Sequence, residues 1–274
     1  MEIGFSTYLF ARQRLSSHML DQVFDRGIRQ IEIYADRQHL DYQDLRHVRD
    51  VAQWFTDHGV SLHSVHAPLF ANSSRERRVP ISPAHTERRL RVESMDQIKR
   101  VIEIAEYLPF RYLVLHLGQP EDEYSLRKFD AAFTSLEHLK IFAKERGTQI
   151  LLENTTDQLG TPERLVEFIQ HTRLDVKVCF DVGHAHLTGG VPRAFEMLRR
   201  YTATIHMHDN RGEKDEHLMP FEGGIDWAAV VPSFSAVEGN APALLEPGSE
   251  GSPDQMAKVQ EVIRKLADIG QGGN

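Results

Sequence analysis

Residues Thr204 to Trp227 read T-I-H-M-H-D-N-R-G-E-K-D-E-H-L-M-P-F-E-G-G-I-D-W, a short apolar strand pattern that ends in a polar loop. Five side chains that can bind metals fall within twelve residues of this stretch: His206, His208, Asp209, Asp215 and His217. Imidazole and carboxylate donors together suit zinc, manganese, iron or cobalt. The alternative is a polar loop that only caps a strand, and the rest of the chain decides between the two.

Eight short β-rich apolar runs alternate with longer helical patterns on both sides of this stretch. The runs lie at residues 2–6, 30–34, 61–66, 112–117, 149–153, 176–181, 204–208 and 243–246. The helical patterns lie at roughly 17–26, 43–58, 85–107, 125–146, 161–171, 191–200, 226–236 and 253–268. Strict alternation is typical of βαβ units and a parallel sheet. We therefore predict an α/β fold closed into a (β/α)8 TIM barrel. An open doubly wound sheet is less favoured because the first strand is not followed by a glycine-rich phosphate turn.

The length of 274 residues suits one such barrel, which typically needs about 250. We predict a single domain over residues 1–269 and a flexible tail over residues 270–274. The one cysteine, Cys179, excludes an internal disulfide and fits a reducing compartment. No apolar run approaches the ~18 residues of a membrane span, and the chain opens on a strand pattern without a secretion signal. We expect a cytoplasmic protein with no membrane partner.

The formal charge of −8 and the pI near 6.0 provide no overall attraction to nucleic acid, which is therefore not the favoured partner. One basic patch stands out: Arg75, Arg77, Arg78, Arg88, Arg89 and Arg91. It is either a solvated charged surface or a site for a phosphate-bearing ligand. Arg75 and Arg78 lie in the longest connection, residues 68–84, and long loops on the catalytic side of a barrel usually shape the pocket. These two arginines are candidate substrate contacts.

Potential metal ligands recur at six consecutive strand ends, where the active site of a (β/α)8 barrel forms. They are His66 in S-V-H-A-P, His116 in V-L-H-L-G, Glu153 in L-L-E-N, Asp181 and His184 in C-F-D-V-G-H, His206, Asp215 and His217 in the opening stretch, and Glu246 in L-L-E-P. Strand alternation points Asp181 and His116 into the barrel. A single such residue is often only a cap, but nine converging carboxylates and imidazoles would be costly to desolvate without cations. The sequence therefore predicts a centre of one to three divalent ions, zinc or manganese.

These motifs, in this order and spacing, resemble those of the xylose isomerase-like barrel superfamily. That superfamily contains sugar and sugar-phosphate isomerases and epimerases and also DNA-repair enzymes of the endonuclease IV type. The resemblance covers strands three to eight. It implies that four residues match the ligands of the single catalytic metal of ketose epimerases: Glu153, Asp181, His206 and Glu246. In those enzymes the two glutamates also act as acid and base. It also implies that the further ligands of the endonuclease's three-zinc cluster are matched by His66, His116, His184, Asp215 and His217, with Glu153 as the bridge.

Other polar residues are weaker candidates for substrate contacts. Glu32 should point into the barrel from the second strand, although a carboxylate paired with an interior basic residue is an alternative. His208 shares the inward phase of His206 and is placed either to touch substrate or to orient a metal ligand. Arg211 follows the seventh strand, near where the resemblance places a substrate-binding arginine of epimerases. His63 is expected to face the helices and to be structural.

Two chemistries share this ligand set. We favour a metal-dependent isomerase or epimerase that acts on a small sugar, sugar phosphate or polyol, with Glu153 and Glu246 moving protons. The connection over residues 35–42 is short, the overall charge does not suit a surface that tracks phosphates, and D-x-H-L-x-P followed by G-G-I-D-W resembles the sugar-directed members. The alternative is an endonuclease IV-like phosphodiester hydrolase acting on abasic DNA, which the complete ligand set supports. A non-catalytic ligand-binding barrel ranks last, and the oligomeric state is open.

Overall fold

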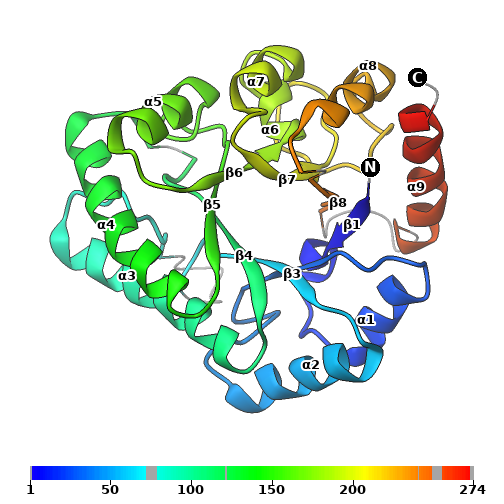
Figure 1. Ribbon diagram of the computed structural model, residues 1–274, viewed down its shortest axis with the longest axis horizontal. Helices are drawn as coiled ribbons and strands as arrows, with labels where there is room; N and C mark the ends of the chain where they lie inside the picture. The colour runs from blue at the N-terminus through cyan, green and yellow to red at the C-terminus, as the bar shows by residue number, and fades with distance from the viewer. Residues whose placement is uncertain (1, 72–78, 121, 240, 249–254, 272–274) are drawn as a thin grey trace.

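Eight parallel strands close into a barrel in the computed structural model, which describes residues 2–71, 79–120, 122–239, 241–248 and 255–271 (Figure 1). Each strand pairs with the next in chain order, and β8 pairs with β1. The strands are β1 Ile3–Ser6, β2 Ile31–Tyr34, β3 Leu62–His66, β4 Phe110–Leu115, β5 Gln149–Glu153, β6 Lys177–Asp181, β7 Thr202–Met207 and β8 Ala243–Leu245. The predicted (β/α)8 barrel is confirmed.

Helices cover the outside of the barrel (Figure 1). They are α1 Ser17–Phe24, α2 Leu45–His58, α3 Arg88–Glu103, α4 Leu126–Lys144, α5 Pro162–Thr172, α6 Val182–Leu187, α7 Val191–Leu198, α8 Trp227–Val230 and α9 Gln255–Gln271, with 3-10 segments η1 Thr7–Phe10, η2 Ile104–Glu106 and η3 Val231–Ala236. Local chemistry sets several of their ends. The Asp44 carboxylate accepts from two backbone N–H groups at the start of α2, and α2 ends at Gly59 in the left-handed region, φ 61°.

Two details differ from the sequence pattern. Strand β4 lies two residues earlier than predicted, so His116 follows the strand and does not belong to it. The short helix α6 was not predicted, because it begins directly where β6 ends. The Asp181 side chain accepts from the His184 backbone N–H at 2.6 Å, so one residue ends the strand and caps the helix.

The barrel interior carries an apolar layer that supports the polar site. Tyr112, Val114, Leu151 and Cys179 form this layer. His116, Glu153 and Asp181 come two residues after three of these side chains and therefore point to the same side, nearer the carboxyl ends of the strands. The alternate residues, among them Leu113, Leu152 and Phe180, belong to the main apolar core. Strand alternation thus brings the polar groups to one end of the barrel.

The expectation that His63 faces the helices was wrong. Its Nε2 lies 3.2 Å from the Thr204 hydroxyl on β7, and its ring meets the edge of the Tyr112 ring. A buried imidazole needs a polar partner, which the apolar layer between strands and helices does not offer. Burial lowers the pKa of His63 to about 4.

The predicted domain boundary, with a flexible tail over residues 270–274, stays a prediction. Helix α9 includes Gly270 and Gln271, and residues 272–274 lie outside the described residues. Within the part of the chain that the structure describes, no helix has both the length and the apolar character needed to cross a membrane.

Candidate metal centre

All nine predicted ligands meet at the carboxyl end of the barrel, in three groups whose donor atoms lie within 4.8 Å of one another. The first group is His66, His116 and Glu153. The second group is Glu153, Asp181, His206 and Glu246. The third group is His184, Asp215 and His217, joined by His208. Glu153 belongs to both the first and the second group, and His184 Nδ1 of the third group lies 3.6 Å from Glu153 Oε1, so the three groups form one continuous centre.

In the first group, two imidazoles face a single carboxylate oxygen. His66 Nε2 and His116 Nε2 each lie 3.1 Å from Glu153 Oε2. The other nitrogen of His66, Nδ1, donates to the Ala67 carbonyl oxygen at 2.8 Å. That contact fixes the ring, so Nε2 faces the Glu153 carboxylate. Nε2 and the carboxylate can share either a proton or a cation.

In the second group, His206 Nδ1 lies between the two glutamates. It is 3.3 Å from Glu153 Oε1 and 3.3 Å from Glu246 Oε2. The opposite nitrogen, Nε2, donates to Glu32 Oε2 at 3.1 Å, and Glu32 also accepts from the Ser64 hydroxyl at 2.7 Å. Glu32 therefore orients His206 from below, in a fully buried position.

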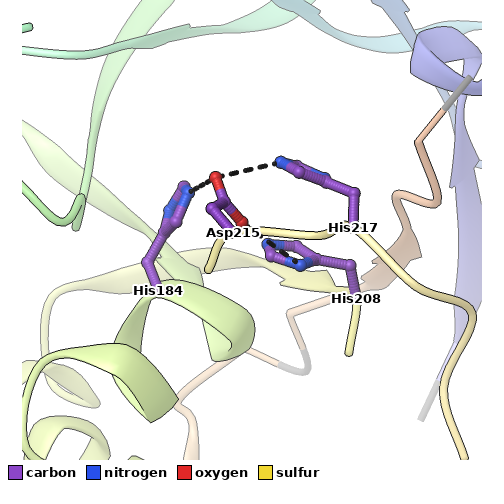
Figure 2. A group of neighbouring side chains, drawn as sticks. All are labelled: His184, His208, Asp215 and His217. Carbon is purple, nitrogen blue, oxygen red and sulfur yellow. Dashed lines mark hydrogen bonds and ion pairs between the residues drawn. The ribbon is translucent and has the colours of Figure 1, made fainter. Parts of the chain in front are cut away.

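In the third group, two imidazoles face Asp215 (Figure 2). His184 Nε2 lies 3.1 Å and His217 Nε2 lies 3.4 Å from Asp215 Oδ2. Their Nδ1 atoms donate to the carbonyl oxygens of Asn154 at 2.9 Å and Glu246 at 3.0 Å. The ring orientations are again set by acceptors outside the group.

This arrangement fits a divalent metal centre. The donors are imidazole nitrogens and carboxylate oxygens, which suit zinc and manganese. In His66, His184, His206 and His217 one nitrogen is occupied by an outside acceptor, as in metal-ligating histidines generally. Asp181 Oδ2 is buried in the second group without a hydrogen-bond partner, and a cation would satisfy it.

The protonation equilibria of the centre reflect the same pairing. Burial opposes charge on these histidines, but contact with Glu153 raises the pKa of His66 to about 9, and Asp215 raises the pKa of His217 to about 9. Burial likewise opposes charge on Glu153, but His206 and His116 hold the pKa of Glu153 well below its usual range. Shared protons thus hold the carboxylates and imidazoles together, and a divalent cation would displace them.

A cavity of about 420 Å³ opens over the centre. Seven of the nine predicted ligands line it, whereas Asp181 and His206 lie beneath. Sequence reasoning missed Tyr8 and Tyr34 in its wall, whose rings pack against His217 at 4.8 Å and His66 at 5.5 Å between centroids. Tyr34 ends β2 and Tyr8 follows β1, so the strand-end rule applied to the first two strands would have found both.

Two other predicted substrate contacts, Glu32 and Arg211, are not among the residues that line this cavity. Glu32 is buried beneath His206 and is not among the lining residues. Arg211 pairs through its guanidinium with Glu216, a residue of the cavity wall, and its side chain is 62% exposed. Arg75 and Arg78 lie outside the described residues.

Comparisons with known proteins agree with this architecture. A family model described as xylose isomerase-like TIM barrel matches residues 20–269. An uncharacterised protein of Methanocaldococcus jannaschii is 28% identical over 282 residues, covering 98% of this chain and 90% of that protein. A probable endonuclease 4 of Haloarcula marismortui is 25% identical over 246 residues, covering 82% and 83%.

Solved structures share the fold. A D-tagatose 3-epimerase-like protein superposes with a TM-score of 0.81 at 24% identity, with 99% of each chain covered. The IolI protein with a bound zinc atom superposes with a TM-score of 0.78 at 18% identity, with 100% of this chain and 99% of that chain covered. Both likenesses concern the barrel as a whole.

Proposed function

The chain belongs to the xylose isomerase-like TIM barrel family, and from this premise we propose that it is a divalent-metal-dependent isomerase or epimerase of a small sugar, sugar phosphate or polyol. One observation carries the proposal. Two carboxylates, Glu153 and Glu246, line the cavity and lie equally far from His206 Nδ1. They are the acid and base of the proposed reaction.

Proton transfer next to a carbonyl needs two groups that touch the same substrate. Glu153 comes from the end of β5 and Glu246 from the residue after β8, so they approach the cavity from different sides of the barrel. A cation held by the second group would polarise the carbonyl oxygen and the neighbouring hydroxyl oxygen of the substrate. The C–H bond on the carbon next to the carbonyl would then become more acidic. One glutamate removes that proton and the other returns a proton. The result is either inversion of the hydroxyl-bearing carbon (epimerisation) or movement of the carbonyl to the neighbouring carbon (isomerisation).

The cavity supports a small substrate. Its volume of about 420 Å³ lies in the range of roughly 300 to 1,000 Å³ that is usual for small-molecule sites. Tyr8 and Tyr34 pack edge to face at 5.1 Å and give one wall an aromatic surface. The net charge of −8 also disfavours a long phosphate backbone.

A second candidate, a phosphodiester hydrolase acting on abasic DNA, is favoured by the third group. An isomerase needs only the second group, whereas clustered cations are typical of enzymes that act on phosphate esters. The relative named as a probable endonuclease 4 points the same way. We rank this function second because the cavity and the charge suit a small molecule better.

Solvent exchange distinguishes the two functions. The protein, loaded with zinc or manganese, is incubated in heavy water with a panel of ketoses and their phosphates, and deuterium at the carbon next to the carbonyl is followed by NMR. We expect metal-dependent exchange in at least one sugar, lost in Glu246→Gln and retained in the control His63→Gln. Incision of an abasic duplex above the metal-only rate, with no exchange into any sugar, would establish the hydrolase instead.

A further inference from the structure

His39 holds together two chain segments that meet at the cavity. It lies in the turn between β2 and α2 and is fully buried. Its Nδ1 lies 2.7 Å from the Gln13 carbonyl oxygen, which can only accept, so Nδ1 carries the proton. Burial lowers the pKa of His39 to about 4, so the ring is neutral at pH 7 and its Nε2 accepts from the Thr7 hydroxyl at 3.0 Å.

The Thr7 hydroxyl extends this contact to the end of β2. Strand β1 ends at Ser6, where the chain turns into η1, and the last paired residues of the two strands are Ser6 and Glu32. Beyond that pair the Thr7 side chain replaces the backbone as acceptor, because its oxygen accepts from the Tyr34 backbone N–H at 3.1 Å. The hydrogen bonds therefore run from Tyr34 through Thr7 to His39, each group donating to the next.

Both of the bonded segments carry residues that line the cavity. The tyrosine rings of the two segments, Tyr8 and Tyr34, meet edge to face with centroids 5.1 Å apart. Tyr8 also packs against His217 and Tyr34 against His66, so the pair lies beside two candidate metal ligands. The lining residues of the two segments are Tyr8, Ala11, Arg12, Tyr34, Asp36 and Gln38. A shift of His39 would therefore move part of the cavity wall.

We propose that His39 is a positioning residue for substrate binding, which acts by holding Tyr8 and Tyr34 in the cavity wall. His39 itself is not among the lining residues, so it acts on a substrate through these two rings. The inference rests on the proposed function, which supplies the substrate, a small sugar or polyol. Glu153 and Glu246 come from β5 and from the end of β8, so loss of the His39 contact should affect substrate binding more than proton transfer.

A single substitution can break the contact with Thr7 and keep the segment in place. His39→Asn retains a side-chain N–H for the Gln13 carbonyl oxygen but is too short to reach Thr7. The first segment also has a second anchor that does not involve this side chain. The Leu15 N–H donates to the His39 carbonyl oxygen at 3.0 Å, and His47 Nε2 donates to the Leu15 carbonyl oxygen at 2.8 Å. We therefore expect the variant to fold with an altered wall.

Spectra of ring-labelled tyrosines test the positioning without any substrate. We expect the nuclear Overhauser cross-peak between the Tyr8 and Tyr34 rings to weaken in His39→Asn. Thr7→Val should weaken it as well, whereas Thr7→Ser, which keeps the hydroxyl, should retain it. Thr148→Val is the matched control, because it removes a buried hydroxyl that donates to a backbone carbonyl oxygen at 3.1 Å, at the amino end of β5. A cross-peak of unchanged strength in His39→Asn would overturn the inference.

Steady-state kinetics with the ketose that exchanges fastest test the role in binding. We expect His39→Asn to raise KM by about 2- to 12-fold, the range for one aromatic contact, and to change kcat by less than about 2-fold. Thr148→Val should leave KM unchanged, which separates the wall from a general loss of stability. A lower kcat at an unchanged KM in His39→Asn would refute the role in binding while the proposed function stands. A panel in which no sugar exchanges would refute the proposed function and the binding role together, while the Tyr8–Tyr34 cross-peak still decides the positioning.

Discussion

Replacing Glu32 by glutamine removes one buried negative charge beneath the second group with little change in side-chain size. Glu32 Oε2 accepts from His206 Nε2 at 3.1 Å and from the Ser64 hydroxyl at 2.7 Å. A glutamine oxygen can accept both hydrogen bonds, so His206 keeps Nδ1 free for a metal. The variant therefore isolates the contribution of the charge.

The geometry sets the size of the expected effect. A zinc ion on His206 Nδ1 would lie about 7 Å from Glu32 Oε2. This distance is the sum of the 3.1 Å hydrogen bond, the width of the imidazole ring and a Zn–N bond of about 2 Å. At an effective dielectric constant of about 20, the attraction between a divalent cation and one carboxylate at that distance is about 5 kcal/mol. Loss of an outer partner of a metal ligand typically weakens binding only about 10- to 100-fold, because the surroundings reorganise. We expect the zinc affinity of the second group to fall within that range.

Competition with a chromogenic chelator measures this affinity at neutral pH. Glu137→Gln on the exposed surface of α4 changes the net charge equally and is expected to leave the affinity unchanged. Ser64→Ala removes one hydrogen bond to Glu32 but keeps its charge, so its effect should be smaller than that of Glu32→Gln. Equal zinc affinities of Glu32→Gln and wild type would refute the role of Glu32 as the partner that sets His206.

Three further predictions concern turnover and stability. Glu153→Gln and Glu246→Gln should each abolish turnover while circular dichroism shows a native fold, and substantial activity in either variant with metal still bound would contradict their roles as acid and base. His63→Gln should reduce the acid sensitivity of the fold. Burial holds the pKa of His63 at about 4, so below pH 6.5 only the unfolded chain gains this proton, and about 3 kcal/mol of unfolding free energy is lost by pH 4. Denaturant titrations at several pH values would measure that slope, and equal slopes in the two proteins would refute the account. Gly183→Ala should lower the melting temperature of the metal-free protein, because the new methyl group would displace the His208 ring; an unchanged melting temperature would show that the ring moves freely.

The barrel and the positions of the ligands were predictable because both follow from strand periodicity. Asp181 lies two residues beyond Cys179, and Glu153 two beyond Leu151, so alternation assigns them to the same interior side before any contact is known. Parallel strands that end at one edge then bring distant residues together. His116 was identified even though β4 ends at Leu115, one residue before it. The chain keeps the direction of the strand over that residue, so His116 still reaches the site.

Features set by side-chain pairing were beyond the sequence pattern. The interior position of His63 depends on a hydroxyl that lies far away in the chain, on β7. Arg211 was expected at the substrate, and the structure pairs it with Glu216 in the cavity wall, a partner that the strand pattern did not predict. Glu32 was expected to touch substrate, whereas it accepts from His206 beneath the cavity. Periodicity gives the direction of a side chain but not the partner that it meets.

The order of the donors along the chain has a consequence for folding kinetics. His66 lies on β3, whereas Glu246 follows β8, whose pairing with β1 closes the circle of strands. The centre, from His66 to Glu246, is complete only once β8 has paired with β7, and such distant contacts form late because loop closure opposes them. A cation that needs the complete centre would therefore bind late in folding, and the rate at which refolding protein takes up zinc should follow the rate at which the barrel forms.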